Sequence, residues 1–222
     1  MCFSAAASFT VGGVLAAIGA ASVAAAANKR ATLFAAVPLG FAAQQVSEGV
    51  VWLTIDAPAH HAVHRAAVFT FLIFALAVWP TWIPLALRQA ERDDARRQWL
   101  DRLTWMGVAV SAVALVLIIG WEPHARVDGY SVRYSFGVDS GELVHILLVA
   151  AYVVPTLGPF FISTINLSDV FGGALIVSMI VTLVIRHDAL TSVWCFFAAV
   201  LSAIVLISVL RRPRQDGVRF SP

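Results

Sequence analysis

The sequence predicts an all-α membrane protein, a polytopic bundle of seven transmembrane helices. Hydrophobic residues make up 60% of the 222 residues and charged residues only 13%, whereas soluble domains carry about 25% charged residues. Apolar runs of about 20 residues, the length that spans a bilayer core, recur along the chain. No block of Lys or Arg is typical of nucleic-acid binding. The expected partner is therefore the lipid bilayer, with an ion or small molecule as a candidate ligand and the oligomeric state left open.

Each apolar segment is expected to be a helix, because lipid leaves no other partner for its backbone polar groups. The first segment lacks a basic leading region and is too long for a cleaved signal peptide, so we interpret it as a retained helix. Residues 1–210 form a single predicted transmembrane domain, and 211–222 form a basic tail. The seven predicted spans are Phe3–Ala27, Leu33–Ile55, Val63–Leu87, Leu100–Trp121, Gly141–Ile162, Val170–Ile185 and Leu190–Leu210.

Basic residues set the predicted orientation. With seven spans, eleven of them fall on one side and four on the other. The positive-inside rule then places the N-terminus outside and the C-terminus in the cytoplasm of a bacterial plasma (inner) membrane. The eleven are Lys29, Arg30, Arg88, Arg92, Arg96, Arg97, Arg102, Arg211, Arg212, Arg214 and Arg219, and the four are Arg65, Arg126, Arg133 and Arg186. The acidic residues between Arg88 and Arg102, Glu91 included, are interpreted as part of a solvated helical extension.

An outer loop of about residues 122–140 is expected to form a short extracellular hairpin or to remain a loop. Apolar residues alternate with polar ones along it, and Asp128-Gly129 is a turn signal between the two halves. A hairpin here would lie over the outer mouth of the bundle as a lid.

All six histidines and both cysteines map to this outer side, and Glu48 is the strongest single candidate near them. A charged side chain inside a span costs about 2.5–3.5 kcal/mol, so it normally faces the bundle interior. Gln44, Gln45 and Trp52 lie four before, three before and four after Glu48, roughly on one helical face. The group is either a functional acid held by amides or a polar clamp between helices.

Cys2 and Cys195 lie near the outer ends of the first and last predicted spans, which are neighbours if the bundle closes into a ring. Three interpretations remain open: a disulfide, a dithiol metal or redox site, and two small buried apolar residues. Removal of Met1 would also leave an α-amine beside the Cys2 thiol.

The histidines offer weaker metal candidates. His60, His61 and His64 cluster in a loop, where histidines are usually solvated. Glu142 and His145 are better placed, because an i, i+3 pair resembles half of the motif in carboxylate-bridged metal bundles. The cofactor is left unknown, with a divalent or soft transition metal as the candidate.

Four strings carry a family resemblance: the start MCFSAAASF, the string QQVSEGVVW, the pair Trp79-Pro80 and the late string SVWCFFAA. They resemble an uncharacterised bacterial family of seven-helix membrane proteins, common in actinobacteria, with an MCFSA-like N-terminus. The resemblance covers the whole chain and implies a topology without an activity. It draws attention to Cys2, Ser4, Ser8, Gln44, Gln45, Glu48, Trp52, Trp194 and Cys195.

Two classes of function fit these residues. The first is a membrane-embedded enzyme or metal-binding protein, with Glu48, Cys2 and Cys195 as catalytic residues or ligands at a site that opens outward. Its surroundings are Gln44, Gln45, Trp52, Ser4 and Trp194. The second is a transporter, channel or sensor in which Glu48 holds a proton or a cation. The inner halves of the spans are nearly free of ionisable groups, which favours the first class, although catalysis itself is left open.

Overall fold

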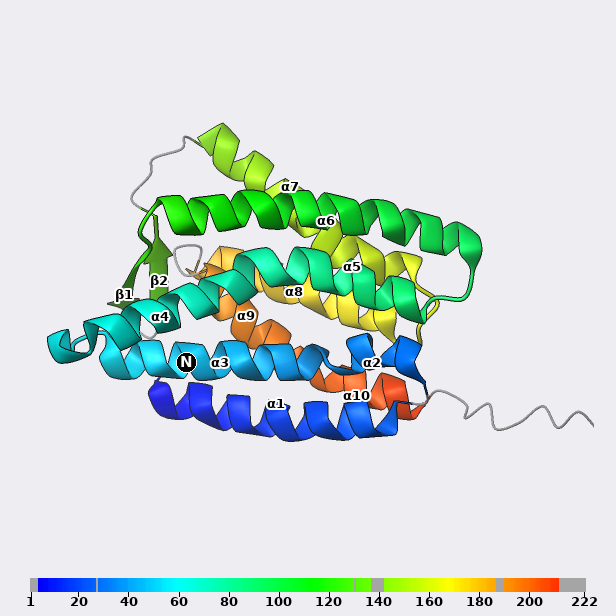
Figure 1. Ribbon diagram of the computed structural model, residues 1–222, viewed down its shortest axis with the longest axis horizontal. Coiled ribbons are helices and arrows are strands. Elements are labelled where there is room, and N and C mark those ends of the chain that lie inside the picture. Colours follow the sequence, from blue (N-terminus) through cyan, green and yellow to red (C-terminus); the bar gives the residue numbers. More distant parts are fainter. Residues whose placement is uncertain (1–3, 27, 130, 137–141, 187–189, 212–222) are drawn as a thin grey trace, which may run out of the picture.

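The computed structural model describes residues 4–26, 28–129, 131–136, 142–186 and 190–211 (Figure 1). Within these ranges the chain is an all-α bundle with one β-hairpin. Consecutive helices join into seven rods that run back and forth along the long axis of the bundle (Figure 1). The rods are α1 (Ala5–Ala25); α2 (Lys29–Ala35) with α3 (Val37–Thr54); α4 (His61–Leu72), a π-helix (Ile73–Val78) and α5 (Trp79–Ala90); α6 (Asp94–Gly120); α7 (Glu142–Ile162); α8 (Ser168–Arg186); and α9 (Leu190–Leu201) with α10 (Ala203–Leu210).

Four helical segments are long and apolar enough to cross a membrane: Ala5–Ala25, His61–Ala90, Asp94–Gly120 and Thr191–Leu210. Two apolar segments are shorter, Leu147–Ile162 and Ser168–Val184. The remaining rod is interrupted at Ala36, between α2 and α3, and Pro38 lies in the first turn of α3, where its missing amide donor is not needed. The predicted all-α fold class is confirmed, and each rod corresponds to one predicted span.

The two ends of the bundle differ in charge. One end, which we call the basic end, contains the α1–α2, α5–α6 and α7–α8 turns and the last residue of α10, at the right of Figure 1. The opposite end, called the hairpin end, contains the start of α1, a short 3₁₀-helix (Pro58–His60) and the two strands. In the described ranges, the basic end carries Lys29, Arg30, Arg88, Arg92, Arg96, Arg97, Arg102 and Arg211, and the hairpin end carries Arg65, Arg126, Arg133 and Arg186.

Small residues bring helix backbones into close contact. A Cβ atom on Gly19 of α1 would lie 2.6 Å from the Leu39 side chain of α3. A Cβ atom on Gly107 of α6 would lie 1.8 Å from the carbonyl oxygen of Pro80 in α5. Because the side chain of glycine is a single hydrogen atom, each of these two helix pairs can approach this closely.

The π-helix in the third rod exposes two carbonyl groups to neighbouring helices. Tyr152 of α7 donates its hydroxyl hydrogen to Ala75 O at 2.7 Å, and Ser111 of α6 donates to Ala77 O. A π-helix has a wider repeat than an α-helix, and such segments are frequent at functional sites. Here it links three rods at mid-bundle and determines where Trp79, the next residue, points.

The predicted hairpin is confirmed. Strand β1 (His124–Asp128) pairs antiparallel with β2 (Ser131–Ser135). Gly129 follows β1 with a φ of 62°, the left-handed conformation that the Asp-Gly signal favours. Val132 is fully buried, and the Tyr134 ring stacks on Phe71 of α4 with 4.6 Å between the ring centroids. The hairpin therefore packs onto the bundle as a cover.

The interpretation of Glu91 as solvated is wrong. Its side chain is 1% exposed and lies between the α5–α6 and α7–α8 turns. Thr164 donates to it from its backbone nitrogen and its hydroxyl, both at 2.7 Å. The backbone nitrogens of Arg92 and Asp93 donate at 2.8 and 3.2 Å. Burial by itself would raise the pKa of Glu91, but these hydrogen bonds outweigh burial and lower the pKa. Glu91 thus clamps the basic end.

We expect Glu91→Gln to lower the free energy of unfolding by about 2 kcal/mol at pH 7, because an amide nitrogen then faces a donor from Thr164. Because the pKa of Glu91 is lower in the folded state than in the unfolded state, its ionised form stabilises the fold at pH values above the unfolded-state pKa. This stabilisation is lost as the pH falls through the folded-state pKa. The difference in melting temperature from the parent, measured in detergent, should therefore narrow below about pH 4. A constant difference across the acid range would contradict the ionised clamp.

Candidate functional site

The interior face of α3 is polar in the half nearer the hairpin end. Gln44 and Gln45 are fully buried, and Glu48 is 1% exposed. Their neighbours Ala43 and Val46 are exposed on the outer face of the same helix. The helical repeat therefore directs three long polar side chains inward while apolar ones cover the outside.

Helix α9 brings two further polar side chains to Glu48. Ser192 and Cys195, three residues apart on one helical face, are both buried. Ser192 Oγ donates a hydrogen bond to Glu48 Oε1 at 2.5 Å. Cys195 carries a free thiol and lies beside Gln44 and Glu48. None of the ion pairs between described side chains includes Glu48. Of the predicted site of Cys2, Glu48 and Cys195, the structure places Glu48 and Cys195 in one region, and Cys2 lies outside the described residues.

Trp79 fixes one of the two glutamines. Its Nε1 donates to Gln44 Oε1 at 2.8 Å, and its ring stacks on Phe41 with 4.0 Å between centroids. Because Trp79 directly follows the π-helix, the wider repeat of that segment sets the direction of the indole. The Gln44 carbonyl is thereby held in place while its Nε2 remains beside the weak acceptor Cys195.

Tyr134 of the hairpin approaches the same group from the hairpin end. Burial raises the pKa of its phenol well above the ordinary value, and the nearby Glu48 and Cys195 raise it further. The phenol therefore remains protonated over the physiological range and offers a donor. Three different elements, α3, α9 and β2, therefore bring Glu48, Cys195 and Tyr134 together.

Several buried polar atoms of this group have no hydrogen-bond partner among the described residues. They are Gln44 Nε2, Gln45 Nε2, Gln45 Oε1, Trp52 Nε1 and Tyr134 OH. Buried polar groups are paired in more than about 90% of cases, because an unmade hydrogen bond costs about 1–3 kcal/mol. Four of the five atoms are donors, so the group is suited to a small molecule or ion shell that presents hydrogen-bond acceptors. We call Gln44, Gln45, Glu48, Trp52, Tyr134, Ser192 and Cys195 the Glu48 cluster.

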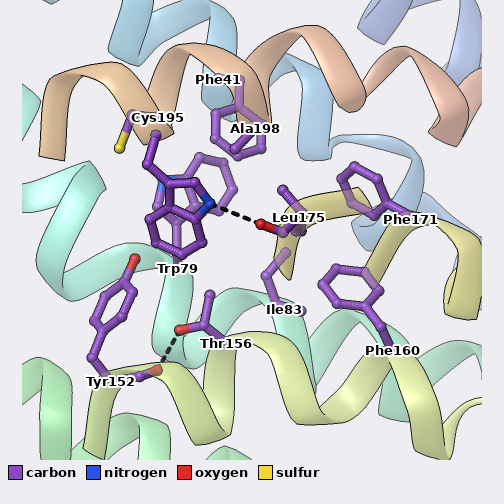
Figure 2. A pocket seen from close by; sticks show the side chains of 11 residues that line it. Phe41, Trp79, Ile83, Tyr152, Thr156, Phe160, Phe171, Leu175, Cys195 and Ala198 are labelled. Carbon is purple, nitrogen blue, oxygen red and sulfur yellow. Dashed lines mark hydrogen bonds between the residues drawn. The ribbon is translucent and has the colours of Figure 1, made fainter. Parts of the chain in front are cut away.

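An apolar cavity borders this cluster on the side away from the hairpin. Its volume is about 20 Å³, room for about one water molecule. Cys195 lies at one end, and Phe160 and Phe171 lie at the other (Figure 2). Tyr152 and Thr156 belong to its lining, but only apolar atoms face the space. The cavity itself therefore adds no polar group to the Glu48 cluster.

The other predicted site residues have separate roles. Ser4 is exposed and caps α1, with its Oγ accepting from Ala7 N at 3.3 Å. Trp194 is buried and donates to Leu175 O at 3.2 Å, so its indole polar atom is occupied in joining α9 to α8. Trp52 is half-buried and contributes an unpaired Nε1 to the Glu48 cluster.

Most of the residues predicted to bind a metal lie outside the side chains that the structure describes. Cys2 and the side chains of Glu142 and His145 lie outside the described residues. His64 Nδ1 lies 3.0 Å from Thr54 Oγ1, while His60 and His61 are exposed. No group of three His, Cys, Asp or Glu side chains within the described ranges is close enough to hold a metal ion. Metal binding by Cys2, Glu48 and Cys195 together stays a hypothesis.

Sequence reasoning missed Ser192, Tyr134 and the role of Trp79. A signal for Ser192 was present, because it precedes Cys195 by three residues and must share its helical face. Tyr134 had a weaker signal, its inward position in an alternating strand. The bond from Trp79 to Gln44 spans 35 residues and depends on the π-helix, so no local pattern indicates it.

Comparison with known proteins places the chain in a family without assigning it an activity. No curated protein and no solved structure matches it. A family described as a family of unknown function, DUF6629, matches residues 1–219. That match spans both ends of the bundle and every residue of the Glu48 cluster, and it bears out the resemblance to an uncharacterised family. The chain belongs to the family of unknown function DUF6629.

Proposed function

We propose that the protein is a multi-pass protein of a bacterial plasma membrane that crosses the bilayer seven times, with the N-terminus outside and the C-terminus in the cytoplasm. The seven antiparallel rods and the four segments of spanning length support this arrangement. The excess of Arg and Lys at the basic end supports the orientation. Exposed Trp99 and Trp105 near that end are typical of residues at a membrane interface.

Within this arrangement, the Glu48 cluster is an outward-facing binding site for a small polar molecule or ion. The observation that carries the proposal is the set of unpaired buried donors around a buried carboxyl group. A polar clamp between helices would have satisfied its own amides, yet neither polar atom of Gln45 has a partner among the described residues. The cost of leaving these groups unpaired is offset if a ligand supplies their partners.

The chemistry of the site is centred on Glu48 and Cys195. A buried carboxyl group without a paired cation favours its uncharged form, in which it both donates and accepts hydrogen bonds. Cys195 adds a thiol next to it, so a thiol-dependent reaction belongs to the same proposal. A resident metal would need Cys2 in addition, with thiolate and carboxylate as its ligands.

A transporter, channel or sensor that uses Glu48 as a proton or cation site is the alternative. One observation favours it, namely that Glu48 has a single neutral hydrogen-bond donor, Ser192, among the described residues. The apolar cavity beside Cys195 argues against a continuous path, because ions and protons cross a bundle along polar groups or water. A sensor, which needs no path, fits better than a channel.

A hydrophobic carbodiimide distinguishes a ligand site from a sealed clamp. We expect dicyclohexylcarbodiimide to add to the uncharged Glu48 carboxyl group as a stable one-to-one adduct, detected by intact-mass spectrometry and peptide mapping. Glu48→Gln should abolish the adduct, and Glu122→Gln, which changes an exposed carboxylate, should retain it. An unreactive parent protein would identify a closed interhelical clamp and end the binding-site proposal.

The hairpin is expected to control access to the site. In a Cys2→Ser background, Tyr134→Ala removes the ring stacked on Phe71 and should raise the rate at which N-ethylmaleimide alkylates Cys195 by about tenfold, as local opening becomes easier. Tyr134→Phe keeps the stacking and should react at the parent rate. Equal rates for all three proteins, at unchanged melting temperatures, would show that the hairpin is no lid.

Impermeant thiol reagents test the orientation. In a Cys2→Ser, Cys195→Ser background, a cysteine at exposed Ala59 should be labelled by an impermeant maleimide on cells with a permeable outer layer. A cysteine at exposed Gln98 should be labelled only after the plasma membrane is opened. The reverse pattern would overturn the orientation, and labelling of both sites on sealed membranes would overturn the seven-span topology.

A further inference from the structure

We propose that a groove at the basic end binds the phosphate of an anionic phospholipid headgroup. The groove lies between the α1–α2 turn and the α5–α6 turn and is separate from the Glu48 cluster. The identification of the ligand as a lipid rests on the membrane orientation proposed above, in which the basic end faces the cytoplasmic leaflet.

The groove has the size of a headgroup. Its volume is about 600 Å³, within the range of about 300–1,000 Å³ that is common for ligand sites. Three cationic side chains and one amide line it together with Ala90. The lining residues come from two turns that are about 60 residues apart in sequence but adjacent in space: Asn28, Lys29, Arg30, Ala90 and Arg92.

Two of the three cationic side chains in the groove have no ion-pair partner among the described side chains. Lys29 and Arg30 are exposed, and neither takes part in an ion pair with a described side chain. Lys29 and Arg30 line one side of the groove and Arg92 lines the other, so the three can contact different oxygens of one phosphate. Guanidinium groups favour bidentate contacts.

The nearby carboxylates are already engaged elsewhere. Asp93 accepts from Arg96 N at 2.8 Å, and Asp94 pairs with Arg97. Asp101 pairs with Arg88, and Glu91 is buried against Thr164. In the described ranges the basic end carries more cationic than acidic side chains, so its net charge favours an anion in the groove.

The position of the groove favours a lipid over a soluble anion. Trp82 of α5 donates to Leu33 O of α2 at 3.0 Å, which joins the two helices whose ends line the groove. Arg102 lies over the exposed Trp99 ring at 4.5 Å from its centroid, an arrangement suited to headgroup depth. Basic pockets between spanning helices on the cytoplasmic side are known to bind anionic lipid headgroups.

Native mass spectrometry of the full-length protein from mixed micelles tests the assignment. The probe is phosphatidylglycerol offered with an equal amount of phosphatidylcholine. We expect the parent protein to retain phosphatidylglycerol selectively and to lose it as sodium chloride is raised. The triple variant Lys29→Gln, Arg30→Gln, Arg92→Gln should lose about tenfold in retention, as removal of several charge-assisted contacts predicts.

The matched control is Arg65→Gln with Arg126→Gln, which removes exposed charge from the hairpin end. The control should retain the lipid. An equal loss in both variants would reduce the effect to net charge and overturn the groove, as would equal retention of both lipids by the parent. Displacement of the lipid by millimolar inorganic phosphate would reassign the groove to a soluble anion.

The salt dependence is measured on the parent protein, so it holds even if the triple variant fails to fold. Failure of the lipid assay leaves the carbodiimide and alkylation results at the Glu48 cluster untouched. Conversely, a reversed thiol-labelling pattern would overturn the proposed topology and place the groove at the outer leaflet, while selective retention in micelles would still identify a phosphate-binding groove.

Discussion

The two buried carboxyl groups in the described part of the chain have very different numbers of hydrogen-bond partners, and this contrast determines what each end of the bundle can do. Glu91 accepts four hydrogen bonds at the basic end, from two backbone amides of its own turn and from both donors of Thr164. Glu48 accepts one, from Ser192. The fold can therefore build a complete clamp where it needs one, so the incomplete bonding at Glu48 is a property of that site. A carboxyl group left short of partners is available to a ligand.

The π-helix explains how the incomplete site is kept in place without being filled. It presents Ala75 O to Tyr152 and Ala77 O to Ser111, which joins α7 and α6 to the third rod. Those bonds fix the position of the π-helix, and Trp79, which follows it, donates a hydrogen bond to Gln44. One amide oxygen of the Glu48 cluster is thereby fixed, while the donors around Glu48 remain unpaired. Rigid support around unsatisfied groups is the arrangement expected of a preorganised binding site.

The sequence predicted the helical rods and the hairpin, but it did not predict the contacts of the buried polar side chains. Apolar length predicted each rod, and Asp128-Gly129 predicted the hairpin, because both are local consequences of backbone chemistry. Pro38 was a local signal for the break at Ala36, which the predicted span Leu33–Ile55 passed over, whereas the π-helix has no comparable pattern in the sequence. Glu91 was misread because neighbouring Arg and Asp residues indicate solvent, whereas its actual partner, Thr164, lies 73 residues away. Burial of a single polar residue is set by tertiary contacts.

Asymmetry along the bundle axis limits what the Glu48 cluster can do. The cluster lies in the hairpin half, the cavity next to Cys195 is apolar, and the next buried carboxylate, Glu91, lies in the turn at the far end. A conduit would need polar groups or water in between, and an ion there would lose its hydration without replacement. A ligand that enters beneath the hairpin would therefore leave by the same route. The geometry favours a protein that binds or modifies a molecule at the outer half of the membrane over one that passes it through.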